Sequence, residues 1–301
     1  MKRALITSGG GAKGAFSVGA LSYIFNNNLG DFDIISGTST GSLIAVFAAI
    51  GDIETLKDVY TNVVNDDIIA RTNLVRQLQQ GEPYLLDTYP LKELINEKVT
   101  DDVFLQVMNS NTTLCLTAVS LQTGKPYIFT TKNIIVPEGY EMKMIQSLSD
   151  LKDAMLASSS QGGFLPPVNI DGHQMVDGGH WTVVPSAAAV AQNPDEIIVL
   201  SNNPRELSPG EPQYTSVINT IMRVISIFLQ GVKTKDYMVL EDYVARTNNR
   251  VFNIEPDTNL DEENPTGLRF DRFLMTLWRS QGEQKAKEVF TESSNEGGLV
   301  T

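Results

Sequence analysis

The sequence has few of the residues on which several common kinds of site depend. Among 301 residues there are one cysteine and two histidines. A single cysteine excludes an internal disulfide, and so few histidines and cysteines offer no metal-ligand spacing, so we expect neither a bound metal nor another cofactor. Cys115 lies in the apolar run LCLTAV, which indicates a buried structural thiol.

Positive charge is also scarce. The chain has 23 Lys and Arg against 36 Asp and Glu, a formal net charge of −13. Because nucleic acids are held by basic surfaces, this balance excludes a nucleic-acid partner. Any contact with a membrane should then come from local apolar surface rather than from charge.

Long hydrophobic runs are missing too. The start, MKRALITSGGG, has too few apolar residues before its glycines for a signal peptide or a membrane span, which predicts a cytoplasmic protein with transient, peripheral membrane contact. The most apolar helical stretch, SVINTIMRVISIFLQGV at 216–232, is interrupted by Arg223 and Gln230. We expect it to pack in the core, with an acyl tunnel or a bilayer surface as the alternatives.

Short apolar runs alternate with longer helical ones, the pattern of a mainly parallel sheet flanked by helices. The expected strands are 3–7, 33–36, 113–120, 127–131, 196–201 and 250–254, and the expected helices 12–28, 41–49, 53–65, 90–97, 144–157, 185–191, 217–246 and 272–290. Without repeats or a linker, we predict one α/β domain over 1–301. Residues 1–201 carry the motifs, 202–292 form a helical extension, and 293–301 are a flexible tail.

Two segments look irregular, namely 71–87, which could be a lid, and 255–268, EPDTNLDEENPTGL. The second has acidic residues at calcium-loop spacing. However, Glu262 stands where such a loop needs glycine, and Leu268 where it needs glutamate. We therefore expect an acidic, solvated loop.

A glycine loop follows the first expected strand. In SGGGAKGAF, Gly9, Gly11 and Gly14 fit the pattern G-x-G-x-x-G. Such a loop directs N–H groups at negative charge, either a pyrophosphate or a transient oxyanion. Asp31 and Asp33 precede the second strand instead of ending it, so they do not fit a ribose-binding carboxylate.

The second expected strand ends in Gly37-Thr38-Ser39-Thr40-Gly41. A G-x-S-x-G turn between strand and helix holds its serine in a strained conformation that only small neighbours tolerate, and this exposes the hydroxyl. The pattern therefore predicts a nucleophilic serine.

Both turns should meet at one edge of the sheet, because parallel strands end on the same side. Acyl transfer needs a nucleophile and donors for the developing oxyanion. Our candidate donors are the N–H groups of Gly10 and Gly11, with that of Thr40, and Lys13 is a nearby cation or a solvated helix residue.

The base for the serine is less obvious. Both histidines, His173 and His180, fall in NIDGHQMVDGGHW, where Asp177 precedes Gly178 and Gly179. The two glycines allow a carboxylate to approach closely, although D-G-G alone is also an ordinary turn. A triad that uses His180, three residues from Asp177, stays open, and His173 fits a turn or surface position.

Together the motifs resemble the patatin-like phospholipases of the bacterial type. They are G-G-G-x-K-G-x-F at Gly9–Phe16, G-x-S-x-G at Gly37–Gly41 and D-G-G at Asp177–Gly179, and the likeness extends over about Lys2 to Ser201. The resemblance implies a patatin-like fold related to the α/β-hydrolases, with the nucleophile elbow after the second strand.

The resemblance also implies roles for residues. Ser39 would be the nucleophile, Asp177 the base of a Ser-Asp dyad, and Gly9–Gly11 the oxyanion loop. The family often has arginine where Lys13 stands, and proline at 161 or 162. The implied activity is calcium-independent hydrolysis of fatty-acyl esters of phospholipids or lysophospholipids through an acyl-enzyme.

Aspartate is a weak base, with an ordinary pKa of about 3.9 against about 6.5 for histidine, so the oxyanion loop must lower more of the barrier. Burial would raise that pKa. The alternatives are a lipid acyltransferase with the same dyad, a nucleotide-binding protein that uses the loop at 9–14, and a catalytically silent lipid-binding module. An activating partner is left open.

Overall fold

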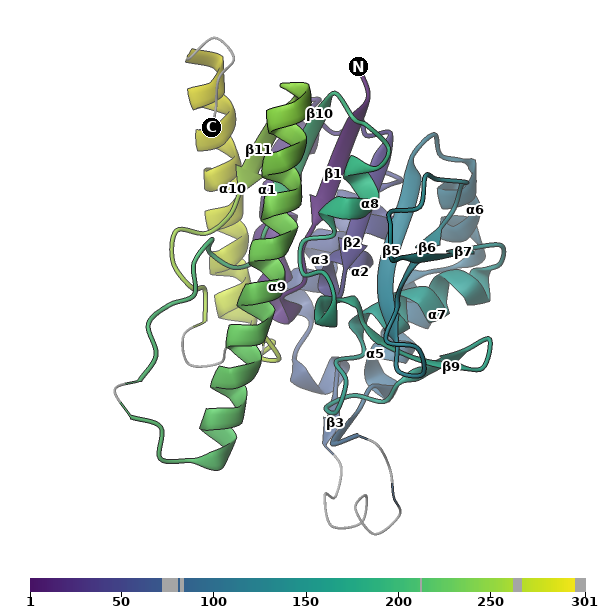
Figure 1. Ribbon diagram of the computed structural model, residues 1–301, viewed down its shortest axis with the longest axis vertical. Coiled ribbons are helices and arrows are strands. Elements are labelled where there is room, and N and C mark those ends of the chain that lie inside the picture. The colour runs from purple at the N-terminus through teal and green to yellow at the C-terminus, as the bar shows by residue number, and fades with distance from the viewer. Residues whose placement is uncertain (72–80, 82–83, 212, 262–266, 296–301) are drawn as a thin grey trace.

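A central sheet carries helices on both faces (Figure 1). The computed structural model describes residues 1–71, 81, 84–211, 213–261 and 267–295. Its nine-stranded sheet has the order β11-β10-β1-β2-β5-β6-β7, and β9 pairs with β5 and β8. The strands are β1 Arg3–Thr7, β2 Ile34–Thr38, β5 Thr113–Ser120, β6 Pro126–Thr130, β7 Glu141–Met144, β8 Val168–Ile170, β9 His173–Asp177, β10 Glu196–Leu200 and β11 Arg250–Ile254.

The helices form the outer layers of the molecule. They are α1 Gly14–Asn26, α2 Thr40–Ala48, α3 Ile53–Asn62, α5 Tyr89–Lys98, α6 Asp101–Asn109, α7 Leu148–Ser159, α8 Ser186–Val190, α9 Val217–Thr247 and α10 Arg272–Asn295. Single turns occur at η1 Gly11–Lys13, η2 Asn65–Asp67 and η3 Gly178–His180, and a separate ribbon pairs β3 Ala70–Arg71 with β4 Leu86–Asp87. Among the described residues, no helix combines the length and the apolar character that crossing a bilayer requires.

The middle strands are buried on both faces because each face carries its own apolar cluster. In β1, Leu5 packs on one side with α1, α2 and α10, whereas Ala4 and Ile6 pack on the other with α8 and α9. Successive side chains of a strand point to opposite faces, so continuous apolar runs such as ALI mark a sheet covered twice.

The sheet is mostly parallel but mixed. The pairs β11–β10, β10–β1, β1–β2, β2–β5 and β6–β7 are parallel, while β5–β6, β5–β9 and β8–β9 are antiparallel. This architecture confirms the expected α/β class with helices on both faces. The single-domain boundaries stay a prediction.

Strand β5 brings two distant segments together. Thr117 pairs with Thr38 at the end of β2, and the next residue, Ala118, pairs with Asp177 at the end of β9. Since β6 occupies the other edge of β5 opposite Ala118, β9 takes the place that β2 leaves free. The tips of β2 and β9 therefore meet head to head beside the same strand.

Several local expectations differ from the structure. Sequence periodicity missed α6, β7, β8 and β9, and most of the lid candidate at 71–87 lies outside the described residues. The loop at 255–268 is not solvated throughout, because Asp261 is buried and Gly267 packs on the glycine loop. Helix α10 continues to Asn295, and 296–301 lie outside the described part.

Candidate active site

Ser39 stands at a strained turn between β2 and α2. Its φ and ψ are 57° and −130°, a region that residues with a Cβ rarely adopt. The neighbouring glycines are required by space, since a Cβ on Gly41 would lie 2.2 Å from the carbonyl oxygen of Thr7, and one on Gly37 2.5 Å from that of Gly41. The elbow is therefore built as its sequence pattern predicts.

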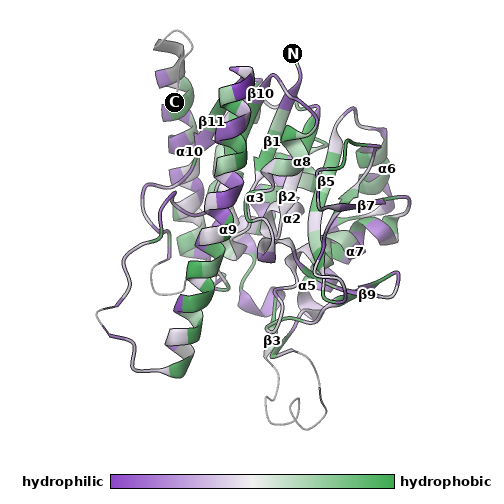
Figure 2. Ribbon diagram, in the orientation of Figure 1, coloured by the Kyte–Doolittle hydropathy of each residue, from purple (hydrophilic) through white to green (hydrophobic). Residues whose placement is uncertain are grey.

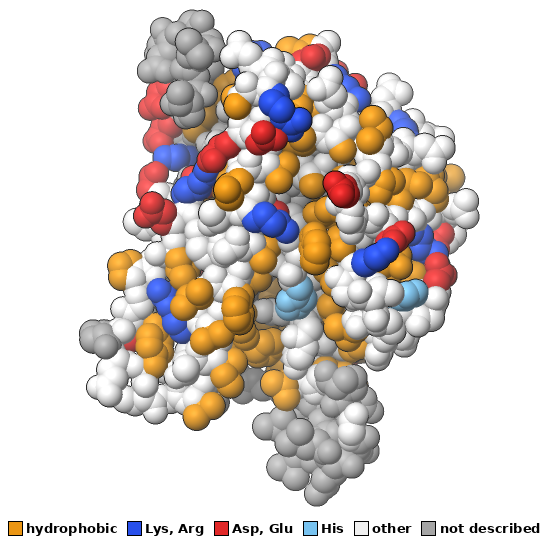
Figure 3. Space-filling view, viewed as in Figure 1, with side chains coloured by type: hydrophobic (Ala, Val, Ile, Leu, Met, Phe, Trp, Pro, Cys, Tyr) orange, Lys and Arg blue, Asp and Glu red, His pale blue; other side chains and the backbone are white. Residues whose placement is uncertain are grey.

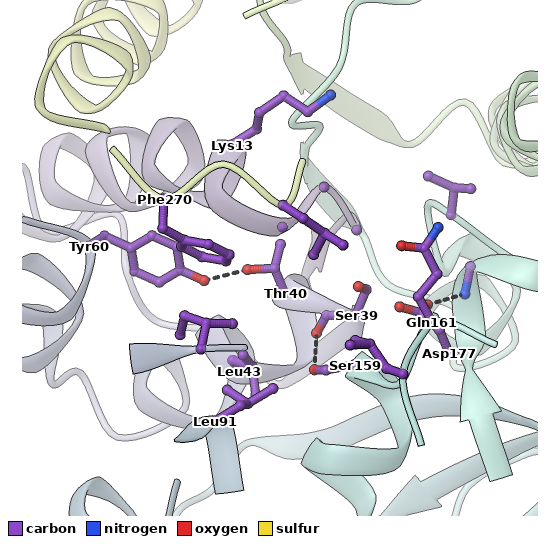
Figure 4. Close-up of a pocket in the computed structure, with 18 of the residues that line it drawn as sticks. Lys13, Ser39, Thr40, Leu43, Tyr60, Leu91, Ser159, Gln161, Asp177 and Phe270 are labelled. Atoms are coloured by element: carbon purple, nitrogen blue, oxygen red, sulfur yellow. Dashed lines mark hydrogen bonds between the residues drawn. The ribbon is translucent and has the colours of Figure 1, made fainter. Parts of the chain in front are cut away.

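Hydrogen bonds fix the backbone of Ser39 on both sides. Its N–H donates to Ser158 Oγ at 3.0 Å, and Ser158 Oγ in turn donates to the carbonyl of Thr117 at 2.6 Å. Its carbonyl accepts from Ser42 Oγ at 2.6 Å and from Ser159 Oγ at 3.4 Å. The side-chain hydroxyl is thus left to face the cavity shown in Figure 4.

The glycine loop borders this hydroxyl. A Cβ on Gly9 would lie 3.8 Å from Ser39 Oγ. The N–H of Gly9 donates to the carbonyl of Val183 at 3.1 Å, so this group is already used. Within the described part of the chain, the N–H groups of Gly10 and Gly11 donate to no protein acceptor, and both residues line the cavity.

The conformation of the loop depends on glycine. Gly11 has φ +57°, and a Cβ there would lie 2.2 Å from the carbonyl oxygen of Gly267. That same oxygen accepts from the N–H of Ala12 at 2.8 Å. The C-terminal part of the chain therefore holds the loop from outside. It occupies the N–H of Ala12, in the turn η1 before α1, which a pyrophosphate would need.

The remaining motif residues support the turns. Gly14 packs against Thr40 Oγ1 and Tyr60, and these two hydroxyls are hydrogen-bonded to each other. Gly178 packs on the backbone of Thr117, where a Cβ would lie 2.3 Å from the carbonyl oxygen. Thr40 and Tyr60 line the cavity, whereas Gly14 and Gly178 do not.

Asp177 enters the cavity from the tip of β9. The residue is 7% exposed, and its carboxylate accepts from the N–H of Gly179 at 2.6 Å. Burial raises the pKa of this carboxyl, while the Ser39 hydroxyl, the Gly179 N–H and the nearby His180 act in the opposite direction. The structure therefore brings Ser39 and Asp177 side by side in the lining of one cavity (Figure 4).

The two histidines differ in position, since His180 lines the cavity and His173 does not. His180 Nε2 accepts from the N–H of Gly162 at 3.1 Å, so this nitrogen is not free to take a proton from Ser39. His173 Nδ1 lies 2.9 Å from Ser120 Oγ, and neither residue of this pair lines the cavity.

The cavity has a volume of about 230 Å³ and two unlike ends. On one side of Ser39 its walls are mostly apolar, although Lys98 of α5 also lines the cavity. The apolar residues come mainly from α2, α3, α5 and α7 and include Phe47, Leu56, Val59, Val63, Ile68, Leu91, Leu94, Ile95, Val99, Met155 and Leu165. On the other side polar groups gather beside Leu207 and Leu229. They belong to Lys13, Asn203, Ser226, Gln230 and Lys233. Such a cavity suits a molecule with an apolar tail and a polar head.

Both lysines at the polar end are buried, each 3% exposed. Lys13 donates to Asn203 Oδ1 and Lys233 to the carbonyl of Pro204, both neutral acceptors. Burial lowers the pKa of Lys13 to about 8 and that of Lys233 to about 8, although Asp261 and Glu255 respectively raise them. Lys13 is thus no solvated helix residue, and the polar end presents positive charge without an ion-pair partner among the described residues.

Sequence reasoning missed Asp236 on α9. This buried carboxylate accepts from Thr182 Oγ1 at 2.9 Å and from the N–H groups of Val183 and Val184 at 2.7 and 2.9 Å. It thereby fixes the segment that follows Asp177. Nothing in the local sequence signals this role, because the partners are more than fifty residues away.

Fold and site together define an α/β protein that presents a serine on a nucleophile elbow, facing a buried carboxylate. Comparison with known proteins is consistent with this class. A family model described as patatin-like phospholipase matches residues 5–207. The chain therefore belongs to the patatin-like phospholipase family.

Individual relatives are more distant. A cUMP-AMP-activated phospholipase of Escherichia coli is 27% identical over 217 residues, which cover 68% of this chain and 62% of the relative. A cGAMP-activated phospholipase of Escherichia coli strain TW11681 is 30% identical over 183 residues, 55% of this chain and 48% of the relative. The chain thus spans about half to two thirds of their length. VipD from Legionella pneumophila has a TM-score of 0.49 at 11% identity, covering 97% of this chain and 67% of that one.

Proposed function

We propose that this chain is a serine acyl hydrolase that cleaves fatty-acyl esters of phospholipids or lysophospholipids. Ser39 is the nucleophile and Asp177 the base. The observation that carries the proposal is the single cavity that holds the elbow serine, a buried carboxylate of raised pKa, and the unused N–H groups of Gly10 and Gly11.

In the first half of the reaction, Ser39 Oγ attacks the ester carbonyl while Asp177 takes the hydroxyl proton. The negative oxygen of the tetrahedral intermediate lies against the N–H groups of Gly10 and Gly11, between the glycine loop and the start of α2. The C–O bond to the glycerol then breaks, and Asp177 returns the proton to the leaving alkoxide.

In the second half, Asp177 removes a proton from water, which attacks the acyl-enzyme. The fatty acid leaves as Ser39 regains the proton. A raised pKa makes Asp177 a better proton acceptor than an exposed aspartate, and a dry cavity strengthens the interaction of the oxyanion with its donors.

The two ends of the cavity support a phospholipid over a neutral ester. The apolar end fits an acyl chain, and the buried ammonium groups of Lys13 and Lys233 fit a phosphate. An uncharged ester would leave the two lysines with only the more distant carboxylates of Asp261 and Glu255 as counter-charges.

Product analysis tests the proposal most directly. The unaltered chain and Ser39→Ala are incubated with a mixed panel of phospholipids and lysophospholipids, and the products are identified by mass spectrometry. We expect free fatty acid only with the unaltered chain, and fluorophosphonate labelling that disappears in Ser39→Ala. Labelling that persists in the variant, or products formed equally by both proteins, contradicts the proposal.

An acyltransferase would use the same acyl-enzyme and differ only in the acceptor. Adding a lysolipid or a simple alcohol to the same assay separates the two activities. Transfer products that exceed free fatty acid at low alcohol concentration would make the transferase the main activity.

We further propose that a cyclic nucleotide activates the chain, because both Escherichia coli relatives are named for such activation. In this proposal the polar end of the cavity binds the phospholipid head group, and no binding site is assigned to the activator. The hydrolysis rate with and without cUMP-AMP and cGAMP is the test, and rates that do not change with either compound contradict this part of the proposal.

A further inference from the structure

The first half of α9 turns an apolar face to solvent. Val217, Ile221, Val224 and Phe228 are 76%, 51%, 43% and 69% exposed. Their spacing of four, three and four residues places them in one line along the helix, because a turn takes about 3.6 residues. This line, here named the α9 outer face, corrects the expectation that 216–232 packs in the core.

The opposite face of the same helix lines the cavity. Four residues on this face, spaced by three, one and three positions, border the cavity that holds Ser39. They are Ser226, Leu229, Gln230 and Lys233. Helix α9 is therefore a wall one helix thick, with the candidate active site on one side and exposed apolar side chains on the other. Figure 2 shows the apolar residues concentrated in the lower half of α9.

Charge along α9 is unevenly distributed. Between Glu211 and Asp236 the sequence has no acidic residue but contains Arg223, Lys233 and Lys235, in a chain whose net charge is −13. The exposed acids of the helix, Glu241 and Asp242, come only in its second half. In Figure 3 hydrophobic side chains gather over the lower half of α9, and the acidic ones on this side lie mostly farther up.

An aromatic residue extends the same face. Lys235 continues the line of the α9 outer face, and its ammonium lies 4.9 Å from the ring centroid of Trp181 and 2.9 Å from the carbonyl of that residue. Trp181 is 37% exposed. In the sequence it directly follows His180, which lines the cavity. Tryptophan is a residue typical of the boundary between water and lipid.

We propose that the α9 outer face, extended by Lys235 and Trp181, docks on an anionic lipid bilayer and sets the cavity against its surface. The proposal rests on the proposed function, since it names the surface through which the substrate is reached. An apolar stripe that continues into Lys235, on a stretch without an acidic residue from 212 to 235, is complementary to anionic lipid. A second copy of so acidic a chain lacks that complementarity.

Vesicle binding tests the proposal separately from catalysis. All proteins carry Ser39→Ala, so that the vesicles stay intact, and are sedimented with vesicles of phosphatidylcholine alone or of equal parts phosphatidylcholine and phosphatidylglycerol. We expect binding to the mixed vesicles that weakens with added salt. Phe228→Asp and Val217→Asp should each lower the partition coefficient roughly tenfold, because each removes apolar area from the contact and adds a negative charge.

The control variant is Leu105→Asp, which places the same charge at a 55% exposed leucine on α6 and should bind as the unaltered chain does. In the catalytically intact background, Phe228→Asp should hydrolyse a soluble short-chain ester at the ordinary rate, so loss of docking is distinguished from loss of activity. Equal vesicle binding by Phe228→Asp and Leu105→Asp overturns the proposal. A dimer that Phe228→Asp dissociates, without vesicle binding by the parent, overturns it as well.

Discussion

Asp236 on α9 holds the backbone of Val183, whose N–H donates to the carboxylate at 2.7 Å. The carbonyl oxygen of Val183 in turn accepts from the N–H of Gly9 at 3.1 Å, at the start of the glycine loop. A carboxylate outside the region that matches the family model thus positions the oxyanion loop through one intervening residue. Asp236 touches no reacting atom, so its role is positioning.

Asp236→Asn should lower both stability and turnover. The amide oxygen can still accept from Val183 and Val184, but an NH₂ group then faces Thr182 Oγ1, whose hydrogen bond must be reversed or lost. We expect this to cost about 1–3 kcal/mol in the free energy of unfolding. Turnover on a soluble ester should fall while KM changes little, because Gly10 and Gly11 lose their alignment. Urea unfolding and kinetics well below the melting temperature measure the two effects.

The matched control is Asp242→Asn on the same helix. Asp242 is exposed and pairs with Arg246 one turn away, so its loss should change stability by less than about 0.5 kcal/mol. Equal effects of the two substitutions on turnover would contradict the positioning role of Asp236.

The same carboxylate should make stability depend on pH. Burial raises the pKa of Asp236 to about 7, against the hydrogen bonds it accepts and nearby Lys235. The folded state therefore binds this proton more tightly than the unfolded chain, where the pKa is about 3.9. The contribution of Asp236 to the free energy of unfolding should fall as the pH rises from about 4 to about 7, and then level off. A Tm-against-pH curve that keeps the same slope in Asp236→Asn would contradict this assignment.

The pH profile of hydrolysis tests the base. If Asp177 accepts the proton, kcat/KM falls as the pH drops through the pKa of that carboxyl, which burial raises above its ordinary range. His180→Ala should keep most of the activity and the same acid limb, since its Nε2 is occupied by the Gly162 N–H. Asp177→Asn should abolish activity with an unchanged circular-dichroism spectrum. An acid limb that vanishes in His180→Ala would instead make histidine the base.

The elbow, and the glycine loop at the same edge of the sheet, could be predicted because their causes are local. Gly37 and Gly41 are required by backbone atoms a few residues away or on the adjacent strand, and such requirements leave a mark in the motif. The strand HQMVD left no mark, since it has few apolar residues and exists through its pairing with β5. The same holds for β7, whose residues are all half-buried.

The parts of the site that come from α9 could not be predicted for a related reason. An apolar pattern of helical period predicts that a helix has a buried face. It does not predict which partner covers that face, or whether a second apolar face stays exposed. In the sequence, Lys233 and Asp236 therefore look like ordinary charged residues of a helix surface. In the structure they are only 3% and 2% exposed, and this burial gives them specific roles. Likewise, the acidic run at 255–268 gave no sign that Gly267 packs on Gly11.

Replacing glycine with alanine should separate steric from conformational effects. A Cβ at Gly41 would lie 2.2 Å from the carbonyl oxygen of Thr7, so Gly41→Ala must displace the elbow and should lower activity at least about tenfold. Around Gly231, in α9, nothing lies within 4 Å of the position that a Cβ would take, and Gly231→Ala should stabilise the fold by roughly 0.5–1 kcal/mol. If Gly41→Ala and Gly231→Ala lose activity to the same extent, the loss is caused by replacing a helical glycine and not by the lack of space at the elbow.

Lys233 should set the preference for an anionic head group. Lys233→Met removes one buried cation from the polar end of the cavity. We expect the ratio of kcat/KM for a soluble short-chain phosphatidylglycerol to that for p-nitrophenyl butyrate to fall about tenfold, the usual worth of one charge-assisted hydrogen bond. Lys92→Met, on the exposed side of α5, is the control and should leave the ratio unchanged.

The same ratio should depend on pH in the unaltered chain. Burial lowers the pKa of Lys233 to about 8, so the ammonium is charged below that pH and neutral above it. The preference for the phospholipid should accordingly decline as the pH rises through about 8, and less steeply in Lys233→Met, where Lys13 is the lysine of the polar end that still titrates in this range. If both substrates instead lose activity in parallel in Lys233→Met, the lysine supports the wall of the cavity and does not recognise the phosphate.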